Sequence, residues 1–215
     1  MQLRKKAMAL WIVWSILVLT AAKPVSAQVS TWPIDSVHSS AHFAVKHFLI
    51  ATVRGTFEGP TGFASFDPKD IRTIQAEATF NMATVNSRDA RRDKSLREDE
   101  GLLEVAKYPT MTFKSTKSEP IAPGHFRLTG DLTLHGVTKS VVLDCMGPTP
   151  EIMLNGIPHI GVSASTTINR KEFGITWHRL MDNGGVQMGD EVQITSALLL
   201  IRSTRTRWPN RLHFF

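Results

Sequence analysis

The sequence is poor in cysteine, and Cys145 is the only one in 215 residues. A single cysteine excludes an intramolecular disulfide, so the fold has to be held by its core even in an oxidising compartment. Cys145 lies in LDCMGP, at the expected end of a strand. It has no neighbouring base, so the local sequence does not indicate a catalytic nucleophile. The chain is long enough for one domain with a substantial core.

The sequence also lacks the common motifs of catalysis. It contains no HExxH, no paired CxxC, no clustered carboxylates, no GxSxG elbow and no glycine-rich phosphate loop after a strand. These absences favour a binding protein over an enzyme. We therefore expect no catalytic residues, no metal and no cofactor.

The stretch HSSAHFAVKH places His38, His42 and His47 within ten residues. If the stretch is a strand, His38 and His42 share a face but stand about 13 Å apart. That separation is too large for two imidazoles on one zinc ion, whose nitrogens lie at about 2.1 Å from the metal. His47 points to the opposite face, beside Phe43 and Val45. It is interpreted as a core histidine, or as a polar anchor if that face lines a cavity.

The N-terminus has the pattern of a secretory signal peptide. Basic residues at 4–6 precede an apolar segment from Ala7 to Ala22, and the small residues Val25-Ser26-Ala27 follow. The rival interpretation is a membrane anchor, but the segment is shorter than the ~20 residues that span a bilayer. We predict cleavage after Ala27, a mature domain over 28–203, and a periplasmic or secreted location.

Removal of residues 1–27, which carry four basic and no acidic side chains, lowers the formal net charge from +6 to +2. A charge near zero gives no reason to expect a nucleic-acid partner. The basic and aromatic end RSTRTRWPNRLHFF is interpreted as a flexible tail over 204–215, or as a weak contact with a membrane surface.

From Thr31 onward, apolar side chains recur at every second residue. In FRLTGDLTLHG the residues Phe126, Leu128, Leu132 and Leu134 alternate with polar ones, and AEATFNMATV, TMTFKSTK and GVSASTTINR repeat the pattern. Such alternation predicts half-buried antiparallel strands, and the Gly- and Pro-containing turns between them suit a sandwich or an up-and-down barrel. The last strand is apolar on both faces after Ser196, which predicts that one side meets another layer, a partner subunit or the tail.

The charge-dense segment from Arg88 to Pro109 breaks this alternation. Its leucines at 96, 102 and 103 have helix-like offsets, which predicts a short helical segment covering a barrel end or a sheet edge. Arg88, RRD at 91–93 and Arg97 are interpreted as a solvated charged face, with an anion clamp as the alternative.

Several separated stretches resemble the YceI-like family, which is also described as polyisoprenoid-binding and lipocalin-like. They are WPIDSVHSSAHFAVKHFLIATVRGTFEGPTGFASFDP, RRDKSLREDEGLLEVAKYPTMTFKST, FRLTGDLTLHGVTKSVVLD, TINRKEFGITW and GGVQMGDEVQI. Together they extend from about Thr31 to Leu200. The resemblance implies an all-β fold, an extended eight-stranded antiparallel lipocalin-like barrel around a long hydrophobic pore. It also implies an isoprenoid lipid as ligand and the formation of homodimers.

This chain departs from the family pattern in two places. Ser95 stands where many members have a histidine in an RDxHL motif, and EDEGLLE replaces a DFFD-like stretch. A head-group contact made by that histidine therefore does not carry over to this chain.

Parity and residue type select the expected lining of the pore. The predicted ligand-binding residues are Phe43, Val45, His47, Arg54, Phe57, Phe80, Met82, Phe113, Phe126 and Leu128, with His47 or Arg54 near the polar end of the lipid. The alternatives are an enzyme that acts on an isoprenoid or quinone lipid through His47 or His135, and a structural stress-response module with a packed core. Alternation alone does not distinguish a hollow interior from a packed one.

Overall fold

The computed structural model describes residues 28–48, 50–178 and 187–202. The predicted signal peptide (1–27) and the C-terminal tail (204–215) lie outside these described residues.

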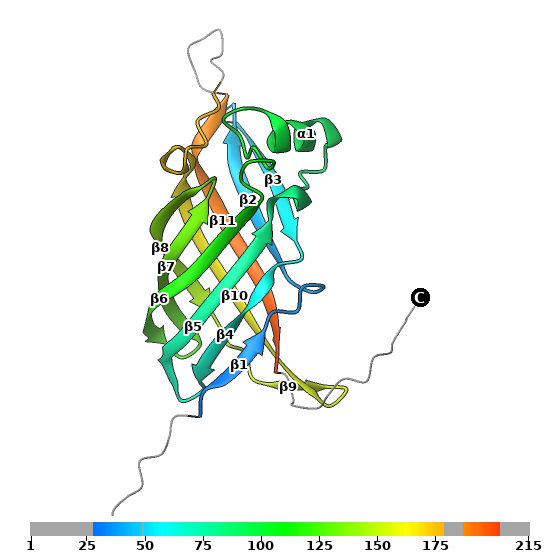
Figure 1. Cartoon of the computed structure of the whole chain (residues 1–215). Coiled ribbons are helices and arrows are strands. Elements are labelled where there is room, and N and C mark those ends of the chain that lie inside the picture. Colours follow the sequence, from blue (N-terminus) through cyan, green and yellow to red (C-terminus); the bar gives the residue numbers. More distant parts are fainter. Residues whose placement is uncertain (1–27, 49, 179–186, 203–215) are drawn as a thin grey trace, which may run out of the picture.

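The described chain forms one curled antiparallel sheet (Figure 1). Its eleven strands are β1 (Ser30–Pro33), β2 (Ser40–His47), β3 (Ala51–Glu58), β4 (Thr61–Asp67), β5 (Asp70–Asn81), β6 (Thr110–Ala122), β7 (His125–Leu134), β8 (Val137–Met146), β9 (Ile152–Leu154), β10 (Ile157–Asn169) and β11 (Met188–Ile201). The strand order is β1-β4-β5-β6-β7-β8-β10-β11-β2-β3, with β9 paired to β10. The all-β, lipocalin-like prediction is confirmed, but the predicted count of eight strands is wrong. Part of the excess is the short strands β1 and β9, which give too little alternation to be recognised in the sequence.

The alternation read from the sequence is the alternation between the inside and the outside of the sheet. On β7, Phe126, Leu128 and Leu132 are buried, whereas Arg127 and Asp131 are exposed. β7 and β8 are joined by a two-residue turn at His135 and Gly136, and both residues have the positive φ that a type I′ turn requires. The apolar faces of the strands therefore meet around a common interior.

The sheet closes on itself along two weakly paired seams. β8 pairs with β7 over its whole length, but it pairs with β10 only from Met146 to Asp144, opposite Ser163 to Ser165. The second seam lies between the outer strands β1 and β3, where isolated bridges join Ile34, which follows β1, to Leu200 on β11, and Thr56 on β3 to Asn86, which follows β5. The backbone N–H of Asp35 also donates to the carbonyl of Leu199 (2.8 Å). These contacts pair the segment after β1 with the edge of β11, and the layer that covers the outer face of the apolar end of β11 stays a prediction.

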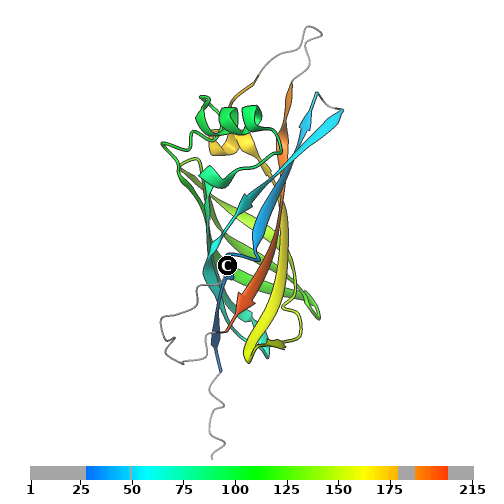
Figure 2. The ribbon, with the colours of Figure 1, turned by 90° about the vertical axis from the view of Figure 1, so that its right-hand side faces the viewer.

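The predicted helical segment is confirmed as α1 (Ala90–Glu98), which lies at the upper end of the barrel (Figures 1 and 2). Asp89 caps it by accepting hydrogen bonds from the backbone N–H groups of residues 91 and 92. Arg92 donates to the hydroxyl and the carbonyl of Ser87 (both 2.8 Å), and buried Asp93 accepts from the backbone N–H of Ser87 (2.7 Å). The Arg92 guanidinium therefore helps to anchor the start of the helix, and the anion clamp stays a prediction.

The segment after α1 is anchored by Glu104. Its carboxylate accepts from the ammonium group of Lys107, from the backbone N–H of Gly101 (3.2 Å) and from Nε2 of His135 (3.1 Å). The His135 ring also packs against Tyr108, with 4.1 Å between ring centroids. These contacts hold the loop at 99–108 over the end of the barrel.

Two aromatic rings of the interior lie directly on glycines of the wall. The Phe43 ring covers Gly55 on the neighbouring strand, and the Phe113 ring covers Gly130. A Cβ at either glycine would overlap the ring. Because the rings lie against the backbone rather than projecting inward, they leave space at the centre of the barrel.

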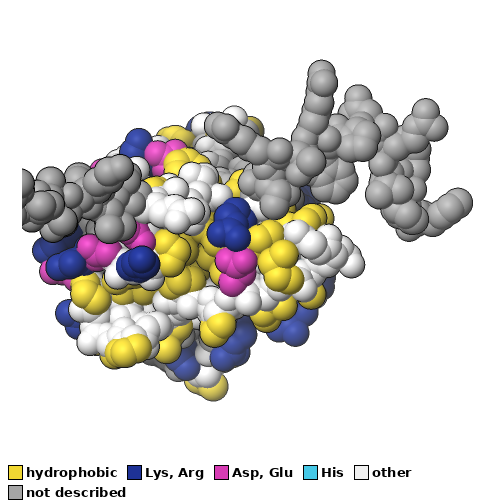
Figure 3. Space-filling view, turned by 90° about the horizontal axis from the view of Figure 1, so that it is seen from below, with side chains coloured by type: hydrophobic (Ala, Val, Ile, Leu, Met, Phe, Trp, Pro, Cys, Tyr) yellow, Lys and Arg dark blue, Asp and Glu magenta, His cyan; other side chains and the backbone are white. Residues whose placement is uncertain are grey.

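The lower end of the barrel carries exposed apolar side chains. Ile152, Met153 and Leu154 of β9 are 57%, 57% and 51% exposed. Figure 3 shows apolar side chains among charged ones on this end of the molecule. These residues do not contribute to the core.

Glu104 should make the stability of the protein sensitive to acid. The hydrogen bond from Lys107, and then that from the Gly101 N–H, lower the pKa of Glu104 to about 2. The stabilisation by ionised Glu104 is thus complete above its unfolded pKa of about 4.3 and is lost as the pH falls through about 2. In acid titrations followed by denaturant unfolding, Glu104→Gln should lose less stability than the wild type between about pH 5 and pH 2. The control Glu58→Gln, at an exposed site on β3, should follow the wild type. Parallel curves for all three proteins would contradict this role.

Gly130→Ala should destabilise the protein by about 1–3 kcal/mol, because the new Cβ would overlap both the Phe113 ring, forcing it toward the interior, and the backbone carbonyl oxygen of Lys114. Gly161→Ala is the matched control on β10, where the nearest atom to a new Cβ is Thr149 Cγ2 at 3.4 Å. Denaturant unfolding measures both. Equal losses of stability in the two variants would mean that overlap at Gly130 is not the cause.

Candidate functional site

The interior contains two apolar cavities, one above the other along the barrel. The upper cavity, of about 90 Å³, lies beneath α1 and the loop that follows it, with Leu96, Leu102 and Leu103 in its lining. The lower cavity, of about 110 Å³, extends toward the β1 end and includes Ile34 and Leu200 in its lining. The barrel is therefore neither fully packed nor open along its whole length.

Eight of the ten predicted ligand-binding residues line these cavities, in two groups. The upper cavity is lined by Phe43, Val45, Phe57 and Met82, and the lower cavity by Phe80, Phe113, Phe126 and Leu128. Strand parity thus brings together residues from five strands and the 3-10 turn that starts at Met82. Their contact with a ligand stays a prediction.

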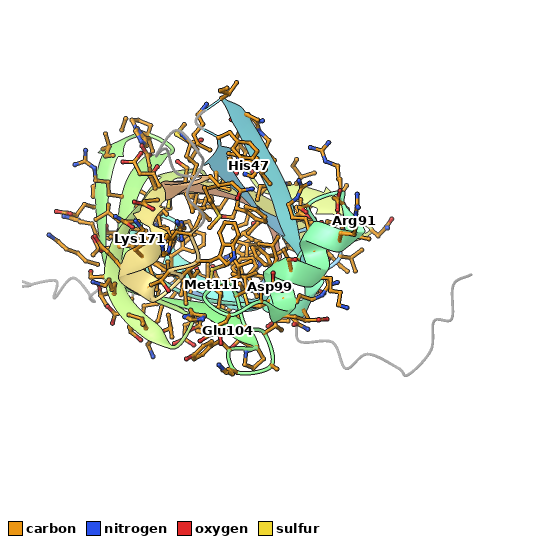
Figure 4. The ribbon with its side chains drawn as sticks, turned by 90° about the horizontal axis from the view of Figure 1, so that it is seen from above. His47, Arg91, Asp99, Glu104, Met111 and Lys171 are labelled. Atoms are coloured by element: carbon orange, nitrogen blue, oxygen red, sulfur yellow. The ribbon has the colours of Figure 1, made fainter. Side chains whose placement is uncertain are left out.

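The two polar residues of the predicted set line neither cavity. His47 lies half-buried at the end of β2 near the upper end of the barrel, with its ring 4.1 Å from that of Phe48 (Figure 4). Arg54 is exposed and lines an open polar groove on the outer face, together with His42, Asn86 and Arg88. A polar group held by either side chain would lie outside the apolar cavities.

Sequence reasoning missed the cavity residues that come from loops. Leu96, Leu102 and Leu103 line the upper cavity from α1 and the loop after it, although their helix-like spacing was visible in the sequence. Ile175 lines the same cavity from the segment after β10. No periodicity marks Ile175, because it belongs to no strand.

Arg170, at the top of the upper cavity, is a buried charge that sequence reasoning also missed. Its guanidinium donates to the carbonyls of Ile175 (2.7 Å), Trp177 (2.8 Å), Gly189 (2.9 Å) and Met188 (3.4 Å), and to the carboxylate of Asp190 (3.1 Å). These bonds use all three guanidinium nitrogens, so Arg170 ties together the segments around the upper end. It has no free donor with which to bind a ligand anion.

The three histidines of HSSAHFAVKH do not lie on one strand. The strand begins at Ser40, so the expectation that His38 and His42 share a strand face is wrong. His38 lies in a bend and pairs with Asp35 (2.8 Å), whereas His42 is exposed on the outer face. Among the described residues, no group of three or more His, Cys, Asp or Glu side chains is arranged to hold a metal ion. None of the helices in the described ranges is long and apolar enough to cross a membrane.

Two groups with catalytic chemistry are held in structural positions. Burial raises the pKa of the Cys145 thiol to about 12, so a nucleophilic thiolate does not form near neutral pH. His135 lies in the β7–β8 turn, where Glu104 and Tyr108 surround its ring. Cys145 and His135 therefore both have positions that the packing of the fold explains.

Comparison with known proteins places the chain among proteins of similar size. A UPF0312 protein of Vibrio parahaemolyticus is 35% identical to it over 60% of this chain and 68% of the relative. The structure is similar to that of the Campylobacter jejuni YCEI protein, with 27% identity, a TM-score of 0.62, and coverage of 74% of this chain and 90% of that one. A polyisoprenoid binding domain from Saccharophagus degradans has the same fold at 14% identity, with a TM-score of 0.57 and coverage of 80% and 98%.

The family model described as the YceI-like domain matches residues 32–199. The matched range runs from β1 into β11 and includes the lining residues of both cavities except Leu200. The chain belongs to the YceI-like family.

Proposed function

We propose that this protein is a carrier or sequestering protein that encloses the tail of a long-chain polyisoprenoid lipid in its barrel. Polyprenyl phosphates and quinones are the ligand classes with such tails. The proposal rests on one observation above all, the pair of predominantly apolar cavities stacked inside a sheet that has an apolar inner face. The fold shared with a polyisoprenoid binding domain supports the same ligand class.

The chemistry of the lining suits such a tail. An isoprenoid tail consists of methylene, methyl and alkene groups, and burial of each CH₂ contributes about 0.8 kcal/mol to binding. Phe43, Phe57, Phe113 and Phe126 offer it broad apolar surfaces. The interior therefore selects for chain length and apolar character rather than for polar groups.

The size of the cavities constrains how the ligand is held. An apolar cavity of ~150 Å³ admits one benzene molecule, so cavities of about 90 and 110 Å³ are too small for a long tail as they stand. The tail must displace side chains as it enters. We infer that lumen side chains rearrange on binding, while the paired strands keep their register.

The polar head group would remain outside the apolar interior. His47 is the better placed of the two predicted anchors, because it lies near the upper end (Figure 4) and pairs with Met188, which lines the upper cavity. Arg54 faces the outer groove, where it could contact an anionic group only outside the barrel wall.

The enzyme hypothesis has less support than the carrier hypothesis. His135 is held by Glu104, His47 lines neither cavity, and the thiol of Cys145 is buried. We therefore propose that the protein has no catalytic activity on the lipid.

Protein purified from the periplasm of its native host should begin at Gln28 and should release an isoprenoid lipid on organic extraction, because the signal peptide is removed and the lumen is occupied. N-terminal sequencing and mass spectrometry of the extract test these two points. The same extraction of Gly130→Ala protein, whose displaced Phe113 ring narrows the lumen, should yield less lipid per folded protein, and Gly161→Ala is the matched control. Lipid-free protein that also fails to bind added prenyl alcohols would count against the carrier function.

The C-terminal tail is proposed to bring the lower end of the barrel to an anionic membrane surface. The described chain ends at Arg202, whose guanidinium donates to Glu151 just before the exposed strand β9 (3.1 Å), and Arg205, Arg207 and Arg211 follow in the sequence. Basic and aromatic residues together suit the membrane–water interface. The homodimer implied by the family resemblance stays a prediction.

Removal of residues 204–215 should reduce co-sedimentation of the protein with vesicles that contain phosphatidylglycerol, because about 1 kcal/mol per basic residue near the surface is lost. Vesicles of phosphatidylcholine alone serve as the control, and binding to them should be weak for both proteins. Equal sedimentation of full-length and truncated protein with the anionic vesicles would exclude the tail as the contact.

A further inference from the structure

The two cavities have three lining residues in common, and these mark the place where the lumen is interrupted. They are Met111 on β6, Ala41 on β2 and Ile194 on β11. Met111 is 5% exposed and Ala41 is 1% exposed, so the interruption lies deep inside the barrel.

The strand order places these residues on opposite walls. β11 and β2 are neighbours, whereas β6 is separated from β11 by β7, β8 and β10. Met111 therefore projects into the interior from the wall that faces Ala41 and Ile194, and Figure 4 shows it within the ring of strands. Since Ala41 has only a methyl group and Ile194 is branched and stiff, the side chain of Met111 is the long one at the interruption.

The chemistry of methionine allows this side chain to move. It is unbranched, with three rotatable bonds and a polarisable thioether, so it can occupy several positions against apolar neighbours at little cost. Its backbone is fixed, because Met111 pairs with Phe80 in the β5–β6 ladder. A rotation of the side chain can thus join the two cavities without disturbing the sheet.

We propose that Met111 is a specificity-determining residue that sets the length of prenyl tail the lumen accepts. With its side chain across the lumen, each cavity is a separate short compartment. With the side chain against the wall, the cavities join into one channel. This inference rests on the proposed carrier function. It narrows the proposed ligands to isoprenoid lipids whose tails are too long for a single cavity.

The test compares two prenyl alcohols that differ only in length, geraniol with two isoprene units and geranylgeraniol with four. Binding is measured by displacement of a bound apolar fluorophore, N-phenyl-1-naphthylamine. The wild type should bind both, and geranylgeraniol more tightly. Met111→Trp should weaken geranylgeraniol binding by about ten-fold or more, because the indole blocks the second cavity. It should leave geraniol binding within about two-fold, because the shorter chain needs rearrangement of the side chains around one cavity only.

Two further substitutions keep the test informative if the indole impairs folding. Met111→Ala removes the interruption and should strengthen binding of the longer alcohol relative to the shorter. Met111→Leu has a similar volume but a stiffer, branched chain, and should weaken only the longer alcohol. Met146→Trp, at a 54% exposed site on β8, is the control for an added tryptophan and should match the wild type with both alcohols.

The outcomes separate this inference from the proposed function. If neither alcohol displaces the fluorophore from the wild-type protein, the carrier function itself is wrong. If the wild type binds both alcohols and the Met111 variants change the two affinities by the same factor, or change neither, then the carrier function stands and Met111 does not select tail length.

Discussion

The structure depends on a single constraint, that successive side chains of a strand point to opposite faces of a sheet that closes on itself. Once the sheet closes, most inward positions are apolar, because the interior offers a polar side chain no water and few hydrogen-bond partners. Phe126 and Leu128 on β7 obey this rule, as do Phe80 on β5 and Phe113 on β6. The binding chemistry is thus a consequence of the fold, since the inner surface is at once the core and the lining of the lumen.

The interior is hollow because of small residues at particular positions. Gly55 and Gly130 let the rings of Phe43 and Phe113 lie against the wall, and Ala41 leaves room opposite Met111. Larger side chains at these positions would fill the space and turn the lumen into an ordinary core. The two ends of the barrel are covered by different segments. At the upper end, α1 and the loop held by Glu104 cover the opening, and at the lower end, the segment after β1 pairs with β11 beside Leu200.

Much of this arrangement could be predicted from the sequence, because local alternation determines which residues face inward. Parity alone selected Phe43, Val45, Phe80 and Phe126 for the interior, and all four line a cavity. The family resemblance supplied the closed, lipocalin-like form, which alternation does not distinguish from a sandwich.

What the sequence could not supply arises from contacts between distant segments. The burial of Arg170 depends on hydrogen-bond acceptors at residues 175, 177 and 188–190, and no local sequence pattern predicts these bonds. The strand boundary at Ser40, which removes His38 from β2, is set by how the segment crosses to meet Leu199. The division of the lumen at Met111 likewise depends on which strands face one another across the barrel.

The sheet combines long strand pairings with one short pairing, and this combination suits a lumen whose side chains must move when a lipid tail enters. Most strands are joined by long ladders, such as the β10–β11 ladder from His159↔Ile201 to Asn169↔Glu191, whereas β8 and β10 share three residue pairs. A tail that enters must exchange contacts between lumen side chains for contacts with itself. Because both sets of contacts are apolar and of similar density, the exchange costs little, provided that the displaced side chains have somewhere to go. Long ladders hold the wall in place while flexible side chains inside it move, and the short β8–β10 pairing leaves the wall one place at which it can widen.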